Sequence, residues 1–358
     1  MATTYTFQPD YAIPPGETLR ELLDEKGLSQ SDLARRTGMA EKTISQIMTG
    51  DAPISLDTAT KLELVLGTPA SFWNSRELAY RESLARVEAS ERFASDVVWL
   101  KEIPWKEMVG RGFVEDVADK AEKVRLALRF FCVSSVDAWR ETWLKPAAQF
   151  RGGDVAKKHP AEVSAWLRMG QINADKIECQ PYDEKAFKVA IAEVRKLLTQ
   201  SSDVWYPAMI KLCAAAGVAV VFVKEIPGAS VSGATQWVSK DKAILQLSLK
   251  YKKDDQIFFS FFHEAAHILK HGRKTFVDSG ESVNDEIEEE ANDFARKVLI
   301  PPQYDRDLAR LLPKCSRVDV LALAQKANIC PGVIVGRLHR MGMDPRFFQG
   351  LRVTIQWG

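Results

Sequence analysis

One stretch of the chain, Phe258 to His271, contains a His-Glu-x-x-His pattern formed by His263, Glu264 and His267. Residues four apart lie on the same face of a helix, so the two imidazoles can reach one metal ion. Glu264 is rotated about 100° from His263 by the helical period, which suits a general base acting on water rather than a ligand. The flanking residues are mostly apolar, and burying these three polar groups costs free energy unless they have partners. The pattern predicts a buried helix that carries a polar site, although five such residues also arise by chance.

A zinc site needs a third protein ligand, and a second predicted helix about twenty residues downstream offers acidic side chains. Apolar residues recur at helical spacing from 285 to 299, and Pro301 ends that helix. Glu288 lies one turn before Asn292, whose amide could orient a ligating histidine. We therefore predict Glu288 as the third ligand and Asn292 as a partner of a ligand, with Glu290 as the alternative ligand.

His271 lies one turn beyond His267 on the same predicted helix face. We expect it to contact a ligand or the substrate. The alternative is an ordinary surface histidine at the end of the helix, just before Gly272.

Residues 1–80 predict a domain of five short helices. Glycines favoured just past helix ends and serines that can cap helix starts mark the boundaries. The predicted helices are Glu17–Lys26, Gln30–Arg36, Ala40–Met48, a fourth from Ser55 to Leu66, and a fifth that begins after Pro69. Small Ala34 and turn-forming Gly38 allow the close helix crossing of a helix-turn-helix.

The segments Gln30–Gly38 and Thr43–Gly50 carry a resemblance to the Cro/C1-type repressor domain, and especially to HigA-like antitoxins of toxin–antitoxin operons. The resemblance implies that the third helix enters the DNA major groove. The side chains expected at base edges are Glu41, Lys42, Thr43 and Gln46, with Gln30 and Ser45 nearer the phosphates. Residues 1–80 contain seven Lys and Arg against eleven Asp and Glu, a balance of −4. That sign favours the alternative of a module retained for dimerisation or protein contact.

Residues 81–200 are predicted to be a helical connector, and residues 201–358 a domain with a small β-sheet and a helical extension. The expected helices are Glu115–Phe131, Ala161–Met169, Glu184–Leu198 and Pro207–Ala216, a loop is expected at Arg151–Pro160, and strands at Val218–Val223, Ala234–Val238 and Ala243–Leu249. The tryptophans of the connector are expected to be packing anchors. Residues 320–338 are expected to form a second helix-turn-helix-like unit that does not bind DNA.

The sequence from about 205 to 305 resembles the ImmA/IrrE family of bacterial metallopeptidases. The resemblance rests on His263–His267, on Glu288 with Ala291-Asn292, and on Leu299-Ile300-Pro301. It implies a gluzincin-like zinc site of two histidines and a downstream glutamate, and action on repressors or related regulators under stress or in mobile-element control. Ala265-Ala266 stands where many members carry a bulkier residue followed by glycine, which leaves the ligands intact.

The net charge of +1 implies no general affinity for nucleic acid or anionic membranes. The five cysteines are scattered without a Cys-x-x-Cys pair, which argues against a disulfide framework and fits a reducing cytoplasm. No signal pattern precedes Pro15 and no apolar run is long enough to cross a membrane. We therefore expect a cytoplasmic protein.

Together these features predict a mainly α (α+β) chain that joins a helix-turn-helix domain to a zincin-like metallopeptidase domain. The leading hypothesis is a bacterial transcriptional regulator fused to a zinc-dependent endopeptidase that cleaves a repressor, an antitoxin or the chain itself. Its expected partners are operator DNA, a protein substrate and a second copy of the chain. Zinc is the expected ion, and Mn²⁺ would suit the same ligands. The second hypothesis is a non-catalytic HigA-like antitoxin or repressor whose metal domain is structural or binds a partner.

Overall fold

The computed structural model describes residues 11–145, 159–250, 252–272, 275–278 and 286–355. Contacts divide the chain into two compact units, Met1–Val98 with Val117–Arg125 and Trp99–Asp116 with Leu126–Gly358. The first unit extends past the predicted boundary at residue 80, because its fifth helix continues to Ser95. The loop expected at Arg151–Pro160 lies mostly outside the described residues.

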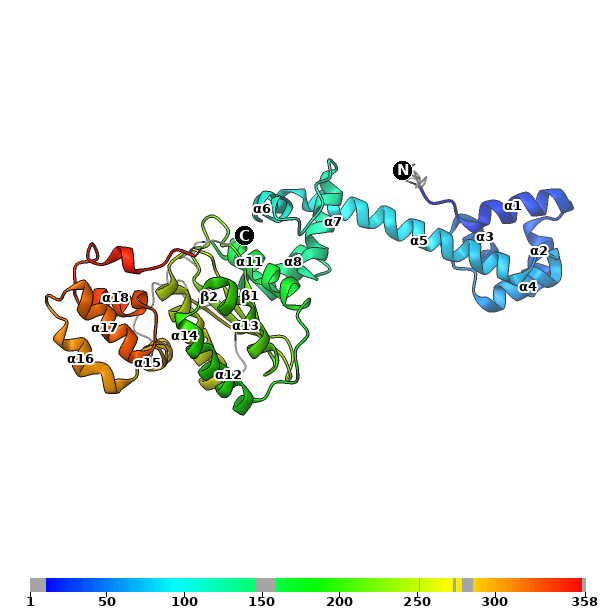
Figure 1. The fold of residues 1–358 in the computed structure, drawn as a ribbon. Coiled ribbons are helices and arrows are strands. Elements are labelled where there is room, and N and C mark those ends of the chain that lie inside the picture. The colour runs from blue at the N-terminus through cyan, green and yellow to red at the C-terminus, as the bar shows by residue number, and fades with distance from the viewer. Residues whose placement is uncertain (1–10, 146–158, 251, 273–274, 279–285, 356–358) are drawn as a thin grey trace. The chain divides into compact units, whose positions relative to one another are not determined.

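The first unit contains the five predicted helices (Figure 1). They are α1 (Pro15–Lys26), α2 (Gln30–Thr37), α3 (Glu41–Thr49), α4 (Leu56–Leu66) and α5 (Ala70–Ser95). Ser29 and Ser55 cap α2 and α4, each accepting a hydrogen bond from the backbone N–H three residues on. Gly27, Gly38 and Gly67 take the left-handed conformation just past α1, α2 and α4.

The core of the first unit forms where α2 and α3 meet α1, α4 and α5. Leu33, Ile44 and Trp73 are fully buried there. A Cβ on Gly16 would lie 2.2 Å from the backbone oxygen of Met48, so glycine permits the close approach of α1 to α3. The predicted helix-turn-helix pair, α2 and α3, therefore packs in the hydrophobic core of the first unit.

Helices and short turns fill the chain between α5 and the sheet. They are η1 (Asp96–Lys101), α6 (Trp105–Gly110), α7 (Lys120–Phe131), α8 (Val136–Trp139), η2 (Arg140–Leu144), α11 (Pro160–Ala174), α12 (Glu184–Lys196), η3 (Leu197–Thr199) and α13 (Ser202–Ala214). α7 begins five residues later than predicted. α13 begins five residues earlier, with Pro207 inside the helix rather than at its start. Trp99, Trp139 and Trp166 are buried, as expected for packing anchors.

A four-stranded mixed sheet lies in the second unit in the order β1-β3-β2-β4. Its strands are β1 (Val218–Phe222), β2 (Gly233–Trp237), β3 (Ala243–Leu247) and β4 (Phe276–Asp278). β1 and β3 are parallel, and β2 pairs antiparallel with both β3 and β4. The first three strands were predicted, and β4 was not. The sheet packs on α14 (Asp254–Lys270), the helix of the His-Glu-x-x-His pattern.

The C-terminal part of the second unit covers α14 and α15 (Glu286–Leu299). It contains η4 (Pro302–Tyr304), α16 (Asp305–Arg310), α17 (Arg317–Ala327), α18 (Pro331–Arg340) and η5 (Gln349–Leu351). α17 and α18 meet at 113° across a short turn, the geometry of a helix-turn-helix. Val333, Ile334 and Leu338 of α18 are buried, and α18 packs on α14. This helix therefore forms part of the core of the second unit and does not have the exposure of a DNA-recognition helix.

Among the described residues, none of the individual helices has both the length and the apolar character needed to cross a membrane. The bent pair α17–α18 meets those two criteria only when its helices are taken together.

Candidate functional site

The candidate metal centre begins on α14, whose polar pattern is buried. His263, Glu264 and His267 are 2%, 0% and 1% exposed. The two imidazole rings lie 4.8 Å apart between centroids, as residues one helical turn apart should. Buried Phe258, Phe261 and Phe262, together with the sheet, hold this helix in the core of the second unit. α14 therefore presents two histidines side by side where water has little access.

α15 supplies the third polar group, since it packs along α14. Its small residues Ala291 and Ala295 are fully buried and allow a close approach of the two helices. Glu288 on the same helix is 6% exposed, whereas Glu289 and Glu290 have side chains 66% and 51% exposed. Glu288 is thus the acidic residue that α15 turns inward.

The three inward side chains converge on one point. His263 Nε2 lies 3.1 Å from His267 Nε2 and 3.2 Å from Glu288 Oε2, and His267 Nε2 lies 3.6 Å from Glu288 Oε1. Zinc held tetrahedrally by bonds of ~2.0–2.1 Å needs ligand atoms about 3.3 Å apart. The two nitrogens lie near that spacing, and each Glu288 oxygen lies near it from one of the two nitrogens. Together the three residues offer the donor set of a zinc site with three protein ligands.

The protonation states of the site also suit metal binding. Burial raises the pKa of Glu288, but hydrogen bonds with His263 and His267 outweigh it and lower that pKa to about 2. Burial lowers the pKa of His267 below its ordinary value of 6.5. A charged carboxylate and a neutral imidazole are the forms that bind metal, and both are favoured here at neutral pH.

Each histidine is oriented through its other ring nitrogen. His263 Nδ1 lies 3.1 Å from Asn292 Oδ1. With a metal ion on Nε2 in place of a proton, the imidazole would carry its proton on Nδ1 and donate it to the amide oxygen. His267 Nδ1 lies 2.8 Å from His271 Nδ1. The structure thus brings Asn292 and His271 to the two predicted ligands, and the 5% exposed side chain of His271 does not fit a surface histidine.

Two residues that the sequence reasoning missed also shape the site. Phe276 of β4 stacks on the ring of His267 at 4.3 Å between centroids. A Cβ on Gly233 of β2 would lie 2.5 Å from Glu264 Oε1, so the absence of a side chain there makes room for the glutamate. Phe276 belongs to a strand of three residues that shows no periodic pattern. Gly233 is the first residue of β2, and a glycine at a strand end is common for many other reasons.

The alternative third ligand, Glu290, lies elsewhere. Its carboxylate contacts Lys270 Nζ at 2.8 Å and His271 Nε2 at 3.2 Å, at the rim of the site. Of the two glutamates, Glu288 is the one in the cluster with both histidines.

The residues predicted to face DNA lie on the first unit. Glu41, Lys42, Ser45 and Gln46 of α3 are exposed, Thr43 is half-buried, and Gln30 is exposed at the start of α2. Ile44 and Ile47 face the core instead. α3 thus offers a polar face to solvent, with the side chains spaced to reach along a groove.

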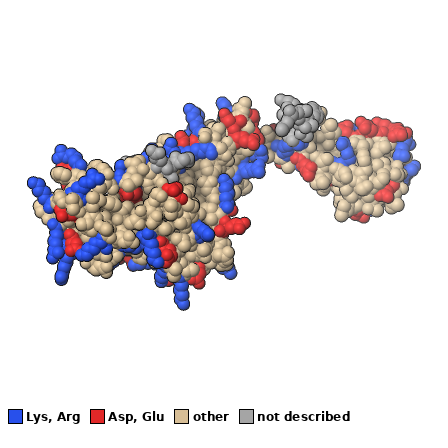
Figure 2. Space-filling model, in the orientation of Figure 1, with Lys and Arg blue, Asp and Glu red and all other residues tan. Residues whose placement is uncertain are grey.

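Part of the acidic charge of the first unit lies on another helix. Figure 2 shows acidic side chains gathered along α1, which carries the exposed residues Glu17, Glu21, Asp24 and Glu25. These are four of the eleven acidic residues in positions 1–80, and with Arg20 and Lys26 the helix contributes −2 to the balance of −4. The negative balance is therefore a weaker argument against a DNA-facing α3 than the total alone implies.

Comparisons with known proteins find similarity to helix-turn-helix proteins. The helix-turn-helix family model matches residues 19–73. An uncharacterised HTH-type transcriptional regulator of Escherichia coli K12, YddM, is 35% identical over 74 residues, which cover 21% of this chain and 77% of that protein. A solved addiction module antidote protein of a HigA family from Coxiella burnetii is 28% identical over 24% of this chain and 94% of its own, with a TM-score of 0.22.

The family model and the similarity to YddM confirm the predicted N-terminal helix-turn-helix, while the resemblance of residues 205–305 to ImmA/IrrE metallopeptidases stays a prediction. Through its N-terminal domain, the chain belongs to the helix-turn-helix family of transcriptional regulators.

Proposed function

We propose that this chain is a bacterial transcriptional regulator in which a DNA-binding helix-turn-helix domain is joined to a zinc-dependent endopeptidase of the ImmA/IrrE type. The observation that carries the peptidase is the buried cluster of His263, His267 and Glu288, with Glu264 beside it on the same helix. Buried charge of this kind is costly without a bound partner. The partner that matches the donors and their spacing is a divalent metal, zinc first and Mn²⁺ second.

Zinc held there would polarise a peptide carbonyl and acidify a water molecule. Glu264 is the group that accepts the proton of the attacking water and later delivers it to the leaving amine. Its burial excludes bulk water and favours proton exchange with the reacting groups alone. Asn292 and His271 hold the two imidazoles in place, and Gly233 leaves the space into which the Glu264 carboxylate points.

The proposed substrate is a protein, namely a repressor, an antitoxin or another regulator encoded near this chain, or the chain itself. The first unit would deliver the peptidase to operator DNA, through Gln46 and Lys42 reading bases. Two copies on a palindromic operator would suit this use of the domain.

The test is Glu264→Gln in the full-length protein. Cleavage of the products of neighbouring genes, and of the chain itself, should fall by at least about 100-fold with the loss of the general base. Bound zinc, measured by elemental analysis, should be unchanged, whereas His263→Ala should lose it. Cleavage that persists in Glu264→Gln would refute the assigned mechanism.

A second proposal is a non-catalytic repressor or HigA-like antitoxin whose metal domain is structural. It rests on the helix-turn-helix family match at residues 19–73, a range that contains no residue of the proposed metal site. It predicts operator binding that survives His263→Ala, with no proteolysis of any neighbouring gene product by the wild-type protein.

A further inference from the structure

His267 is linked to the surface of the second unit by a chain of hydrogen-bonding groups. His267 Nδ1 lies 2.8 Å from His271 Nδ1, and His271 Nε2 lies 3.2 Å from Glu290 Oε2. The two histidines come from α14 and the glutamate from α15. Exposure rises along the chain, from 1% for the His267 side chain to 5% for His271 and 51% for Glu290.

The carboxylate end dictates the direction of every hydrogen bond in this chain. An ionised carboxylate only accepts, so His271 Nε2 must donate to Glu290. A neutral imidazole with its proton on Nε2 has a lone pair on Nδ1, so His271 Nδ1 accepts from His267. His267 then carries its proton on Nδ1 and a lone pair on Nε2, the atom that faces His263 and Glu288.

We propose that Glu290, acting through His271, is a positioning residue that fixes the tautomer and orientation of His267 for metal binding. This inference rests on the proposed metal site. Carboxylate–histidine pairs behind metal-bound histidines have this effect directly; here a second histidine extends the link by one helical turn.

The neighbouring contacts support this role for the chain. Lys270 Nζ contacts the second oxygen of Glu290 at 2.8 Å, which leaves Oε2 turned toward His271. Phe276 stacks on His267 and lies at an angle to His271, with centroids 4.3 and 5.7 Å away. These packing contacts already limit rotation of both imidazole rings. The main effect of the hydrogen bonds is therefore to select the tautomer of His267.

The other proposed ligand, His263, is held by a different contact. The effects of the groups behind His267 and His263 can therefore be tested separately. His263 donates to the neutral amide of Asn292, and no charged group takes part in that contact. Removing Glu290 should therefore affect His267 while leaving the hydrogen bond of His263 in place.

The experiment measures zinc affinity of the full-length protein by competition with a chromophoric chelator at neutral pH. Loss of a group behind a ligating histidine typically costs about 10- to 100-fold in metal affinity. We expect His271→Phe to fall in that range and Glu290→Ala to weaken binding by about 10-fold. Glu290→Gln retains an acceptor oxygen and should recover most of the loss.

Glu289→Ala is the matched control. Glu289 is the preceding residue on α15, is similarly exposed, and pairs with Arg296 rather than with a histidine. Its removal should leave zinc affinity unchanged. Because the Glu290 side chain is half exposed, its variants should fold. They therefore test the hydrogen-bonded link from Glu290 to His267 even if His271→Phe fails to fold.

Equal zinc affinity of Glu290→Ala and Glu289→Ala would overturn the positioning role and leave the metal site standing. Wild-type protein that takes up no zinc would overturn the metal site and the proposed peptidase together. These two failures are therefore distinguishable.

A second readout observes the tautomer itself. The chain has five histidines, so selective ¹⁵N labelling of histidine gives a tractable NMR spectrum. In the zinc-loaded wild type, His271 should show its proton on Nε2. A proton on Nδ1 of His271, or on both of its ring nitrogens, would contradict the proposed direction of the hydrogen bonds from His267 to Glu290.

Discussion

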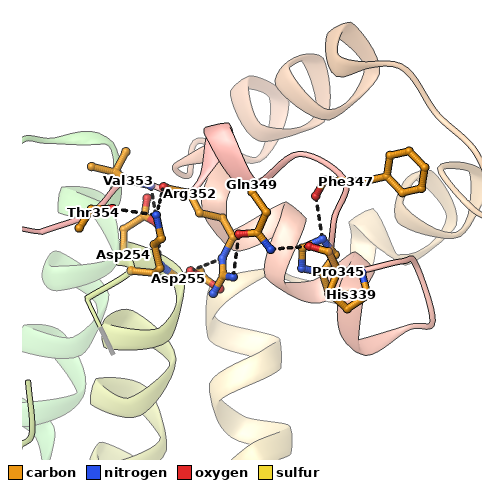
Figure 3. Close-up of polar contacts among 10 residues, drawn as sticks. Asp254, Asp255, His339, Pro345, Phe347, Gln349, Arg352, Val353 and Thr354 are labelled. Atoms are coloured by element: carbon orange, nitrogen blue, oxygen red, sulfur yellow. Dashed lines mark hydrogen bonds and ion pairs between the residues drawn. The ribbon is translucent and has the colours of Figure 1, made fainter. Parts of the chain in front are cut away.

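Asp254 and Asp255 begin α14 as buried carboxylates, 5% and 8% exposed. Figure 3 shows the C-terminal segment reaching them: Arg352 Nε donates to Asp255 at 2.9 Å, and the Val353 N–H donates to Asp254 at 3.1 Å. Asp255 thus has a cation, whereas Asp254 is held by backbone amides. Burial, reinforced by the charge of Asp255, raises the pKa of Asp254 to about 6.

Asp254→Asn is expected to stabilise the protein above pH 6. Below the ordinary carboxyl pKa of 3.8, Asp254 is protonated in both folded and unfolded chains. As the pH rises toward about 6, the unfolded carboxyl ionises while the folded one keeps its proton, so stability falls, and above that pH the full cost persists. Asparagine keeps an acceptor oxygen without that cost, so the gain should approach about 3 kcal/mol at neutral pH.

The measurement is unfolding of the metal-free protein as a function of pH, for the variant and the wild type. The stability difference should shrink as the pH falls and vanish near pH 4, where Asp254 is neutral. A variant less stable than the wild type at every pH would show that the backbone hydrogen bonds require the carboxylate itself.

At the scale of elements, α11 approaches the sheet through Gly170. A Cβ there would lie 1.8 Å from Gln246 Oε1 of β3. Gln246 is fully buried and donates through Nε2 to the Trp166 carbonyl at 2.8 Å, while its oxygen accepts from Gln236 of β2 at 3.3 Å. A polar network thus ties α11 to β2 and β3, and glycine gives it the space.

Gly170→Ala should destabilise the second unit by about 2–3 kcal/mol, because the methyl group displaces Gln246 and leaves buried polar atoms unsatisfied. Gly110→Ala is the control. Gly110 is the last residue of helix α6, and a Cβ there would meet no atom within 4 Å. That change should be neutral or slightly stabilising. Denaturant unfolding followed by tryptophan fluorescence measures the stability of both variants. Equal stability of the two would contradict the close contact between Gly170 of α11 and Gln246 of β3.

Sequence patterns located the elements with strong local signals. The capping serine and the glycine around α2 define its ends, and the apolar residues of α15 at helical spacing predicted its buried face. Glu288 could be chosen over Glu290 because Asn292 lies one turn beyond it, and the structure places both beside the histidines. Short elements without a period could not be found this way: β4 exists because β2 offers it an edge, a long-range pairing that no local pattern encodes.

At the scale of the molecule, the two groups of functional residues belong to separate units. The residues of α3 proposed to face DNA lie in the first, and the proposed metal-binding residues of α14 and α15 lie in the second. The charge is also divided: residues 1–80 have a balance of −4 and the remainder +5, within a total of +1. Electrostatic attraction of the first unit to DNA must therefore come from local side chains such as Lys42 rather than from its net charge.

This separation predicts that DNA affinity and zinc content respond to different variants of the full-length protein. Gln46→Ala should weaken binding to the DNA upstream of the gene by about 10-fold or more, the loss of one base-specific contact, without changing zinc content. His263→Ala should remove zinc and leave DNA affinity unchanged. Gel shifts and elemental analysis of both proteins provide the measurement. A loss of DNA affinity in a His263→Ala protein whose first unit remains folded would mean that the metal site controls the repressor domain, and metal binding would then be a regulatory signal as well as a catalytic requirement.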